Sequence, residues 1–350
     1  MSKLVVFIKR TLTYLAKKYV CRSRNLNMKA YSRVKLSKQE RAEIKSVWGQ
    51  DFFINGRHFC YEFYKGFGSF SSGLVPNDVY AEAEMILNPS RNSLFLQHKC
   101  ALKYIIPERN RPKTIVQKIN DNFLDKENQL IDRKSAVDLL SQFDEFFIKV
   151  AVDSGGGRGV LKVRKGDDIY KLFNEYKTDF ICQEALVEHD TLSQYNPQCI
   201  NTIRVLSLNL NGKCTVLSSF IRMGGIGSVV DNLHSSKGTG VLVGLKPDGS
   251  LYPFGVDKHY NKVYVSPVGK SFEGKKVEHF DKVLDFVKYW HLQIPYANLI
   301  GWDIILDKSG SPIVIEINLD SADIAAHQVF NGPVFGNRLD EVIKYLAKQP

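Results

Sequence analysis

The first 39 residues contain no aspartate or glutamate, and acidic residues begin only at Glu40. The same segment has eleven lysines and arginines, so it accounts for the whole net charge of +11 of the 350-residue chain. Residues 40–350 are therefore formally neutral. A nucleic-acid-binding domain normally carries a basic patch on its folded surface, whereas a neutral body behind a basic arm is typical of a tethered globule. The charge distribution thus argues against a nucleic-acid partner.

The start of the chain also lacks a targeting core, because the apolar run Leu4–Ile8 is too short for a signal peptide or a membrane span. The pattern of residues 1–35 nevertheless predicts a basic amphipathic arm. Its apolar positions fall near one helical face and its basic positions mostly elsewhere: Leu4, Ile8, Leu12, Leu15 and Tyr19 against Lys9, Arg10, Lys17 and Lys18. Such an arm is either a helix that binds an anionic membrane, at roughly 1 kcal/mol per basic residue, or a solvated tail or a helix packed on the body.

The six cysteines form no C-x-x-C pair and no regular framework. Without a signal peptide they are interpreted as reduced thiols, which predicts a cytoplasmic protein, held at the inner face of the membrane if the arm is a tether. The eight histidines show no ligand spacing with the cysteines, which argues against a zinc site. The sequence also has no Ser-His-Asp or Cys-His signature of a protein nucleophile.

What the sequence does contain is a mixture of helices and antiparallel strands. Ser37 and Glu40 form a capping box at the start of a helix that is expected to run to about Tyr64. From about Pro112 strands and helices are mixed, and an Asn-Gly turn between apolar runs predicts a hairpin. The expected strands lie within 114–119, 146–152, 159–163, 180–186, 200–223, 240–252 and 301–319, and the later helices near 135–143, 168–176, 277–290 and 338–346. We predict an α+β fold with antiparallel sheets in at least two lobes.

The last hairpin, residues 301–319, places acidic side chains opposite each other. With Ser-Gly at the centre of its turn, Asp303 faces Glu316, and strand alternation puts Asn318 on the same face. The interleaved side chains point the other way, into a core: Ile304, Ile315 and Ile317. Two carboxylates about 5 Å apart by their β-carbons repel unless a cation lies between them. Together with an amide oxygen they suit Mg²⁺. The alternative is an exposed polar strand face with solvated charges.

A glycine-rich stretch, KVAVDSGGGRGVLKV, begins at Lys149. With Gly155 and Gly156 at its centre Lys149 faces Lys162, and two opposed lysines disfavour each other unless an anion bridges them. Arg158 adds a guanidinium that can bind phosphate oxygens. The stretch joins strand to strand and is not GxxxxGK[ST], so binding at a helix N-terminus as in a P-loop is the wrong mechanism. It is either a phosphate-binding loop or a flexible turn.

Between these two segments, FICQEALVEH is a strand that leads from Glu184 through Ala185 to Val187. Such a strand either offers a backbone edge to an adenine and a carboxylate to a ribose, or is an ordinary strand end. His189 is either a structural histidine or a catalyst.

Two arginines lie in the hairpin of the Asn-Gly turn. Arg204 interrupts an apolar strand, and a buried arginine needs a partner. A two-residue turn pairs Asn201 with Arg222 and puts Arg204 on the other face, whereas a one-residue bulge brings both arginines together. Structural ion pairing is the alternative for either arginine.

In this order, the segments FFIKVAVDSGGGRGVLKV, CQEALVEH, NTIRV, VVDN and GWDIILDKSGSPIVIEIN resemble the ATP-grasp superfamily, most closely the sugar-transfer-associated branch found with surface-polysaccharide genes. The similarity extends from about Leu36 to Leu346 and leaves out the basic arm. It implies two α+β lobes with antiparallel sheets that clamp ATP, behind an N-terminal helical region. The implied division is 1–35 for the arm, 36–98 for the helical region, 99–182 for the lobe with the glycine loop and 183–350 for the lobe with the metal site.

The resemblance also implies roles for individual residues. The phosphates of ATP would be bound by Lys99, Lys149, Lys162, Gly155, Gly156, Gly157, Arg158 and Gly159. Adenosine would be held by Glu184, Ala185, Leu186 and Val187, with His189 beside them. The catalytic residues would be Lys149, Arg204 and Arg222, of which the arginines meet the γ-phosphate or the acceptor carboxylate. Mg²⁺ would be held by Asp303, Glu316 and Asn318. After the asparagine this chain reads NLDSADIAAHQ, where related ligases often have a proline or glycine segment, a departure that concerns the substrate pocket.

Enzymes of this superfamily transfer the γ-phosphoryl group to a carboxylate, and an amine attacks the resulting acylphosphate to form an amide. Phosphoryl transfer requires positioning and charge neutralisation, so lysines, arginines and Mg²⁺ suffice without a protein nucleophile. The resemblance therefore implies an ATP- and Mg²⁺-dependent ligase of capsular or surface-polysaccharide synthesis. It would join a small-molecule amine or amino acid to a carboxylate-bearing sugar or glycan, or an amino acid to an amino sugar. The alternatives are a sugar or small-molecule kinase on the same fold and a nucleotide-binding accessory subunit of a polysaccharide assembly complex.

Overall fold

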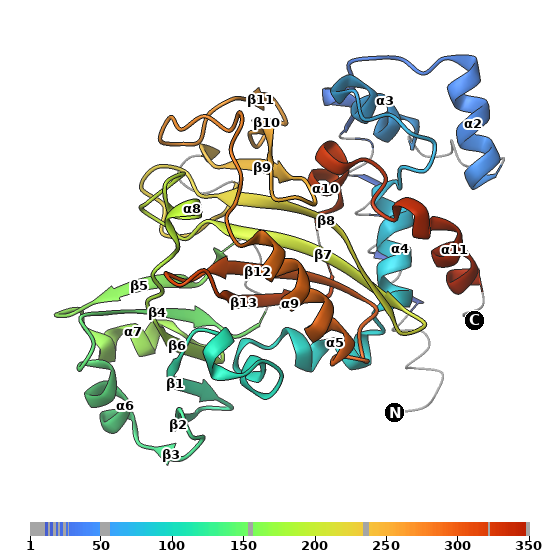
Figure 1. The fold of residues 1–350 in the computed structure, drawn as a ribbon. Coiled ribbons are helices and arrows are strands. Elements are labelled where there is room, and N and C mark those ends of the chain that lie inside the picture. The colour runs from blue at the N-terminus through green and yellow to red at the C-terminus, as the bar shows by residue number, and fades with distance from the viewer. Residues whose placement is uncertain are drawn as a thin grey trace.

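Two antiparallel sheets organise the part of the chain that the computed structural model describes, which is residues 28–49, 57–152, 157–233, 238–320 and 323–347 with a few positions between 11 and 26. Figure 1 shows the first sheet at the lower left and the second across the centre, with helices from both ends of the chain gathered at the right. The α+β prediction with antiparallel sheets is confirmed.

The first sheet has the strand order β3-β2-β1-β6-β4-β5. Its elements are β1 (Thr114–Ile119), β2 (Asn122–Asp125), β3 (Leu130–Ile131), α6 (Arg133–Leu140), β4 (Glu145–Val150), β5 (Val160–Arg164), α7 (Ile169–Glu175) and β6 (Phe180–Glu184). Helices α6 and α7 cover one face, where Phe146 and Ile148 are buried with Leu140. Because side chains alternate along a strand, Phe147 and Lys149 of β4 project from the opposite face. That face is turned toward the second sheet.

The second sheet has the order β11-β10-β9-β8-β7-β12-β13. Its elements are α8 (Asp190–Ser193), β7 (Thr202–Leu210), β8 (Lys213–Met223), β9 (Val241–Leu245), β10 (Leu251–Val256), β11 (Lys262–Val263), α9 (Phe280–Leu292), β12 (Leu299–Leu306) and β13 (Pro312–Asn318). Helix α9 lies over one face, as Figure 1 shows, and its Val283 and Val287 share a core with Trp302 and Ile304. The buried polar side chains Ser207 and His291 lie in the same layer, where Ser207 Oγ and His291 Nδ1 are hydrogen-bonded at 2.7 Å.

Helices from both termini cover part of the other face of the second sheet. They are η1 (Met28–Tyr31), α2 (Lys38–Trp48), α3 (His58–Phe67), α4 (Asn77–Leu87), α10 (Ile324–Asn331), η7 (Gly336–Arg338) and α11 (Leu339–Ala347). Three further elements lie beside β13 or β6: α5 (Ser90–Gln97), η3 (Lys99–Tyr104) and η4 (Glu108–Asn110). Leu96 of α5 and Leu102 of η3 join the core beneath α9. The predicted capping box is confirmed, since Ser37 and Glu40 each bond the other's backbone N–H. The single helix to Tyr64 is wrong, because α2 ends at Trp48 and a separate helix, α3, begins at His58.

One face of β7 changes from apolar to polar along its length. Leu206, Leu208 and Leu210 are buried in a core shared with α4 and α11. Thr202 and Arg204 lie on the same face, since residues two apart on a strand project together, but they line a cavity instead. The covering helices therefore stop where the polar side chains begin, and this boundary positions the candidate site.

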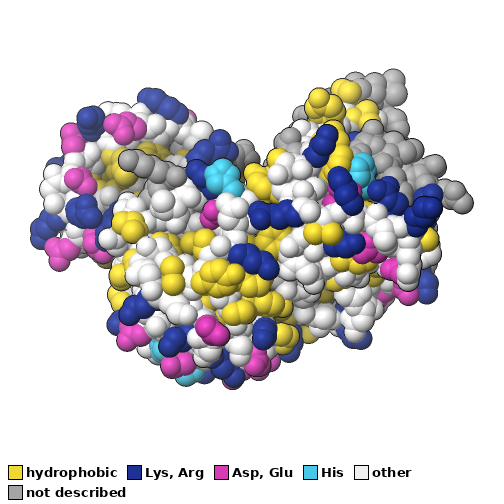
Figure 2. All heavy atoms as spheres, turned by 90° about the horizontal axis from the view of Figure 1, so that it is seen from above, with side chains coloured by type: hydrophobic (Ala, Val, Ile, Leu, Met, Phe, Trp, Pro, Cys, Tyr) yellow, Lys and Arg dark blue, Asp and Glu magenta, His cyan; other side chains and the backbone are white. Residues whose placement is uncertain are grey.

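The surface of the folded body carries both signs of charge. On the face seen in Figure 2, Lys and Arg side chains are interspersed with Asp and Glu. No described helix is long and apolar enough to cross a membrane. The predicted arm lies largely outside the described residues, and of its apolar positions Leu12, Leu15 and Tyr19 are described as helical and exposed.

Candidate functional site

A cavity that is partly open to solvent lies between the two sheets. Ligand pockets in proteins usually combine apolar walls with a few placed polar groups. Here the apolar wall includes Phe147, Val160, Leu186, Ile200 and Ile315. The polar groups come from both sheets and from η3, so the cavity exists only because the two sheets face each other.

The β12–β13 hairpin supplies three of the polar groups. Asp303 pairs with Glu316 across the strands, as predicted, and Asn318 lies on the same face with its amide donating to Asp303 Oδ2 at 3.3 Å. The route to this register differs from the prediction. The turn holds three residues, because Asp307 N–H donates to the Ser311 carbonyl, and a bulge after Asp303 restores the expected pairing.

The bulge also corrects one predicted core residue. Ile304 and Ile317 are buried beneath α9, but Ile315 is the extra residue of the bulge and lines the cavity. An extra residue shifts the alternation of side chains along one strand, which is why Ile315 leaves the core face.

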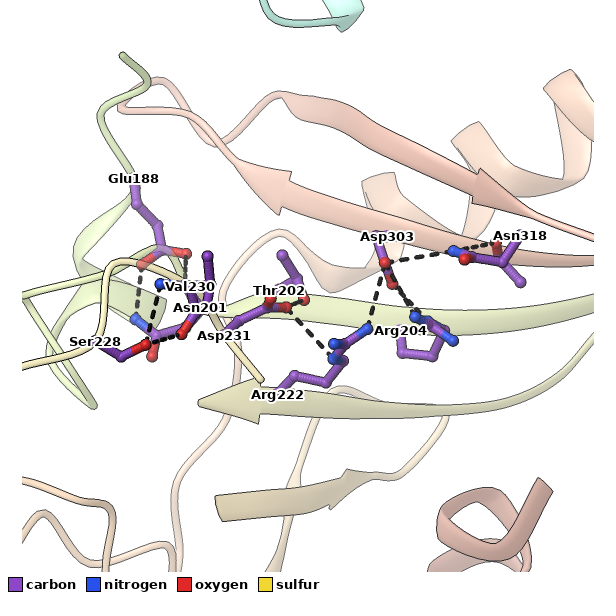
Figure 3. Close-up of polar contacts among 11 residues, drawn as sticks. Glu188, Asn201, Thr202, Arg204, Arg222, Ser228, Val230, Asp231, Asp303 and Asn318 are labelled. Carbon is purple, nitrogen blue, oxygen red and sulfur yellow. Dashed lines mark hydrogen bonds and ion pairs between the residues drawn. The ribbon is translucent and has the colours of Figure 1, made fainter. Parts of the chain in front are cut away.

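Two arginines converge on the Asp303 carboxylate, as Figure 3 shows. Arg204 binds both of its oxygens, through Nε to Oδ1 and through Nη2 to Oδ2 at 3.0 Å, and Arg222 Nη1 lies 3.4 Å from Oδ2. Asp303 is only 5% exposed. Burial alone would raise the pKa of its carboxyl, but the two guanidiniums and the Asn318 amide hold that pKa below its ordinary value.

The meeting of the arginines follows from a second bulge. Thr202, not Asn201, pairs with Arg222, and the register of β7 with β8 shifts between Leu206 and Ser207. The Asn201–Arg222 register is therefore wrong, and the bulged alternative is confirmed. Arg204 stands two residues after Thr202, so it shares a face with Arg222.

Two lysines approach from the opposite wall. Lys99 Nζ, from η3, lies 3.0 Å from Glu316 Oε1. Lys149, from β4, forms no ion pair with any described residue and lines the cavity. Burial, together with the charge of Lys99, lowers the pKa of the Lys149 ammonium to about 8. A cation without a carboxylate partner, set beside another cation, is suited to bind an anion.

The glycine loop adjoins this wall. Gly155 and Gly156 lie outside the described residues, but Gly157 lines the cavity. Gly157 has a φ of +75°, and a Cβ there would lie 3.0 Å from Val230, on the connection that follows β8. The two lobes thus touch at a point where a side chain would hold them apart.

The donor set fits a hard divalent cation. Two carboxylates and an amide oxygen are oxygen ligands of the kind that Mg²⁺ takes. In the structure, the carboxylate charge of Asp303 and Glu316 is neutralised by Arg204, Arg222 and Lys99. A metal ion at this position would supply the same positive charge at the same oxygens.

A family model described as sugar-transfer associated ATP-grasp matches residues 80–344, which is most of the chain. The chain belongs to this family. Its fold, with two lobes and antiparallel sheets, is accordingly the ATP-grasp fold that the sequence segments led us to expect. No curated protein matches the chain in sequence.

Solved structures with a similar fold share little sequence with this ATP-grasp chain. The biotin carboxylase domain of Hydrogenobacter thermophilus 2-oxoglutarate carboxylase is 13% identical over 77% of this chain and 52% of its own, with a TM-score of 0.47. D-alanyl-alanine synthetase A of Vibrio cholerae is 14% identical over 74% and 67%, at 0.46. The VanG D-Ala:D-Ser ligase of Enterococcus faecalis is 13% identical over 74% and 64%, at 0.47. The chain thus spans about half to two thirds of these proteins.

Several predicted site residues of the ATP-grasp chain lie away from the cavity. Lys162 does not face Lys149, because β4 pairs Lys149 with Val160 and Phe147 with Lys162, so that geometric prediction is wrong. Lys162 Nζ instead lies 2.7 Å from Glu145 Oε2. The prediction placed the centre of the loop between Gly155 and Gly156. The observed strand pairs are centred one residue earlier in the chain, which accounts for the error. Arg158 is exposed and does not line the cavity.

The segment after β6 divides in the same way. Glu184 and Leu186 line the cavity, whereas Ala185 between them is half-buried and Val187 is exposed. His189 does not reach the cavity and caps α8, where its Nδ1 accepts a hydrogen bond from the backbone of Thr191. This position favours the structural interpretation of His189.

The sequence analysis missed a buried glutamate at the same place. Glu188 accepts hydrogen bonds from the backbone N–H of Asn201 at 2.8 Å and from its amide at 2.9 Å. Asn201 directly precedes Thr202, so this contact fixes the start of the strand that carries Arg204 (Figure 3). The polar pair Glu188 and Asn201, next to apolar residues at strand ends, was the available signal. Burial raises the pKa of Glu188 to about 8 despite the Asn201 bonds.

We expect Gly159→Ala to destabilise the lobe that carries the glycine loop. Gly159 has a φ of +68°, and a Cβ would lie 2.5 Å from Val150 Cγ2. Gly166→Ala is the matched control, because its φ is +99° with no atom within 4 Å of a Cβ. Overpacking costs about 1–3 kcal/mol, so urea denaturation should show Gly159→Ala less stable than Gly166→Ala by about that amount. Equal stabilities would contradict the close contact.

The pKa of Glu188 predicts a pH-dependent stability. The folded protein holds a proton on this carboxyl between pH 4.5 and about 8 that the unfolded chain releases. Stability is therefore lost as pH rises through this window. Between pH 5 and pH 8 the wild type should lose more unfolding free energy than Glu188→Gln, which cannot titrate. Asp285→Asn, an exposed carboxylate on α9, is the control and should follow the wild type. Parallel profiles for wild type and Glu188→Gln would refute the assignment.

Proposed function

We propose that this ATP-grasp chain is an ATP- and Mg²⁺-dependent ligase that joins a carboxylate to an amine through an acylphosphate. The partners are a sugar acid or carboxylate-bearing glycan and an amino acid or other small amine, or an amino acid and an amino sugar, in surface-polysaccharide assembly. The family description, sugar-transfer associated, supports a carbohydrate partner. One observation carries the proposal: a single cavity sets Lys99 and Lys149 against Asp303, Glu316 and Asn318.

The cavity divides into regions that suit the parts of ATP. Phe147, Val160 and Leu186 supply an apolar wall for the base, and Glu184 beside them can accept hydrogen bonds from a ribose. Lys149 lines the same cavity and forms no ion pair with another described residue, so it can bind phosphate oxygens. Lys99 would join it there, as a second cation from the same wall.

The opposite wall suits the transferred group. Asp303, Glu316 and Asn318 would hold Mg²⁺, which when bound neutralises charge on the phosphate oxygens. Arg204 and Arg222 would bind the γ-phosphoryl oxygens or the acceptor carboxylate, because a guanidinium matches the geometry of both anions. Both arginines orient the acceptor oxygen toward the phosphorus, and their positive charge lowers the repulsion between two anions that must react.

The thiols of Cys100 and Cys199 are not suited to act as nucleophiles. Burial raises the pKa of Cys100 and of Cys199 to about 12, so both thiols are neutral at physiological pH. Neither lines the cavity. Direct transfer of the phosphoryl group to a substrate carboxylate, followed by attack of the amine, therefore needs only the charged residues already described.

We expect Lys149→Met to reduce ADP formation from ATP by about 10²-fold or more, since it removes a charge from the reacting phosphates. Lys165→Met is the matched control, because Lys165 lies on the same lobe with a 70% exposed side chain. The assay is ADP release with a panel of sugar acids, amino sugars and amino acids, with mass spectrometry of the products. Turnover of Lys149→Met or of Glu316→Gln at the wild-type rate would refute the ligase proposal.

The same panel separates the two alternatives. A phosphorylated product that accumulates without any amine indicates a kinase. ATP binding without turnover on every substrate indicates an accessory subunit. An amide that is lost from the surface polysaccharide when the protein is removed would identify the natural product.

We also propose that residues 1–35 bind an anionic membrane surface. The segment has a basic charge and an apolar face, of which the described positions Leu12, Leu15 and Tyr19 are exposed. Deleting the segment would remove Arg22, whose Nε lies 3.6 Å from the buried Asp78, so charge reversal is the better experiment.

Replacing Lys9, Arg10, Lys17 and Lys18 by glutamate should weaken co-sedimentation with phosphatidylserine-containing vesicles and leave it unchanged for neutral vesicles, which bind weakly. ADP release in solution should stay at the wild-type rate. Equal binding of both proteins to anionic vesicles would exclude the tether.

A further inference from the structure

The connection that follows β8 brings a fourth carboxylate to the cavity, that of Asp231, besides those of Glu184, Asp303 and Glu316. This connection is folded tightly on itself. Ser228 Oγ donates to the Val230 carbonyl at 2.7 Å, and Asn196 Nδ2 donates to the Gly224 carbonyl at 2.6 Å. A Cβ on Gly224 would lie 2.1 Å from the Val230 oxygen, so only glycine permits this path. Asp231 is therefore held by its backbone and not by the ligand-binding hairpin.

The Asp231 carboxylate contacts both members of one cross-strand pair. Thr202 Oγ1 donates to Asp231 Oδ2, and Arg222 Nε lies 3.4 Å from the same oxygen. Thr202 and Arg222 are direct partners across β7 and β8. Figure 3 shows Asp231 and Thr202 on the side of Arg222 away from Asn318. Asp231 therefore anchors the guanidinium from a direction that Asp303 does not use.

The two arginines differ in their anchoring as a result. Arg222 contacts two carboxylates through different nitrogens, Nε toward Asp231 and Nη1 toward Asp303. Arg204, among the described residues, hydrogen-bonds only to Asp303. A divalent cation at Asp303 and these guanidiniums compete for the same carboxylate oxygens, because all three are positive. When a cation occupies the Asp303 oxygens, Arg222 still contacts the Asp231 carboxylate, whereas Arg204 has no carboxylate contact left among the described residues.

We propose that Asp231 is a positioning residue that holds Arg222 in place while Asp303 exchanges its arginine contacts for a divalent cation. This inference rests on the proposed function, since it takes Asp303 as a metal ligand. Arg222 then remains a fixed anion-binding group, and Arg204 becomes the group released to bind the incoming anion. The side chain of Arg222 is 17% exposed, so stranding its charge without a carboxylate would be costly. Asp231 avoids that cost because it stays in contact with Arg222 and is not one of the residues that would hold the metal.

The consequence is measurable in metal affinity. Asp231→Asn keeps an acceptor for Thr202 but removes the charge that holds Arg222. Cation binding at Asp303 then leaves Arg222 without a carboxylate, so the full-length variant should bind Mn²⁺ about tenfold or more weakly than the wild type, the usual effect of losing a supporting residue around a metal ligand. Mn²⁺ binding is followed by electron paramagnetic resonance, with protein alone and with ADP present, against a protein-free ADP control.

The double variant Asp231→Asn with Arg222→Met decides the mechanism. It has no stranded guanidinium, so its Mn²⁺ affinity should return to the wild-type value or exceed it. If Asp231 were a direct metal ligand, the double variant would stay weak and the proposal would be wrong. Unchanged Mn²⁺ affinity in Asp231→Asn would also overturn it. Asp303→Asn serves as the reference for the metal site itself: if wild type and Asp303→Asn bind Mn²⁺ alike, the proposed metal site fails together with the inference.

Discussion

The Asp303 carboxylate is the point at which four strands of the second sheet meet in the candidate site. It lies on β12, is almost fully buried, and receives hydrogen bonds from Arg204 on β7 and Asn318 on β13, with Arg222 of β8 within ion-pairing distance. A buried charge is tolerated only when it is paired and hydrogen-bonded, so these four strands must keep their registers. The bulges in the β12–β13 and β7–β8 pairs are the local adjustments that bring these side chains onto one face.

The two lysines on the facing wall differ in whether they have a carboxylate partner. Lys149 is brought into the cavity by β4 of the first sheet, and its ammonium has no carboxylate within ion-pairing distance among the described residues. Lys99 reaches across to Glu316 and so links the walls. One wall of the cavity therefore carries a carboxylate that arginines neutralise. The other carries a lysine whose positive charge has no ion-pair partner among the described residues. An ATP-grasp chain that binds a polyanionic nucleotide with a divalent cation uses both properties.

The position of Arg222 depends on a further carboxylate, that of Asp231. Asp231 belongs neither to the hairpin of the metal ligands nor to the first lobe, and its position depends on a compact connection between β8 and β9. Glu188 has a comparable role for the backbone, since it holds Asn201 at the start of β7. Both carboxylates act through other residues. Both stand within segments that the sequence marks clearly, CQEALVEH and VVDN, but nothing in those strings shows which partner each carboxylate holds.

The sequence by itself predicted most strands of the two sheets and, in the last hairpin (residues 301–319), the pairing of Asp303 with Glu316. This pairing is confirmed, although a three-residue turn and a bulge produce it instead of the expected Ser-Gly turn. The capping box starts α2 at the expected residue. These features depend on neighbours along the chain or across one turn, where few geometries are possible. The end of the first helix and the facing of Lys149 and Lys162 were predicted wrongly, because they depend on loop conformations with more freedom.

Only the tertiary structure decided which charges meet. Whether Arg204 joins Arg222 depends on a one-residue bulge that local sequence allows but does not require. The contacts of Lys99 with Glu316 and of Arg222 with Asp303 join residues of different elements, 217 and 81 positions apart. Such pairs are chosen by the packing of whole sheets, since burial makes each charge seek a partner wherever the fold brings one close.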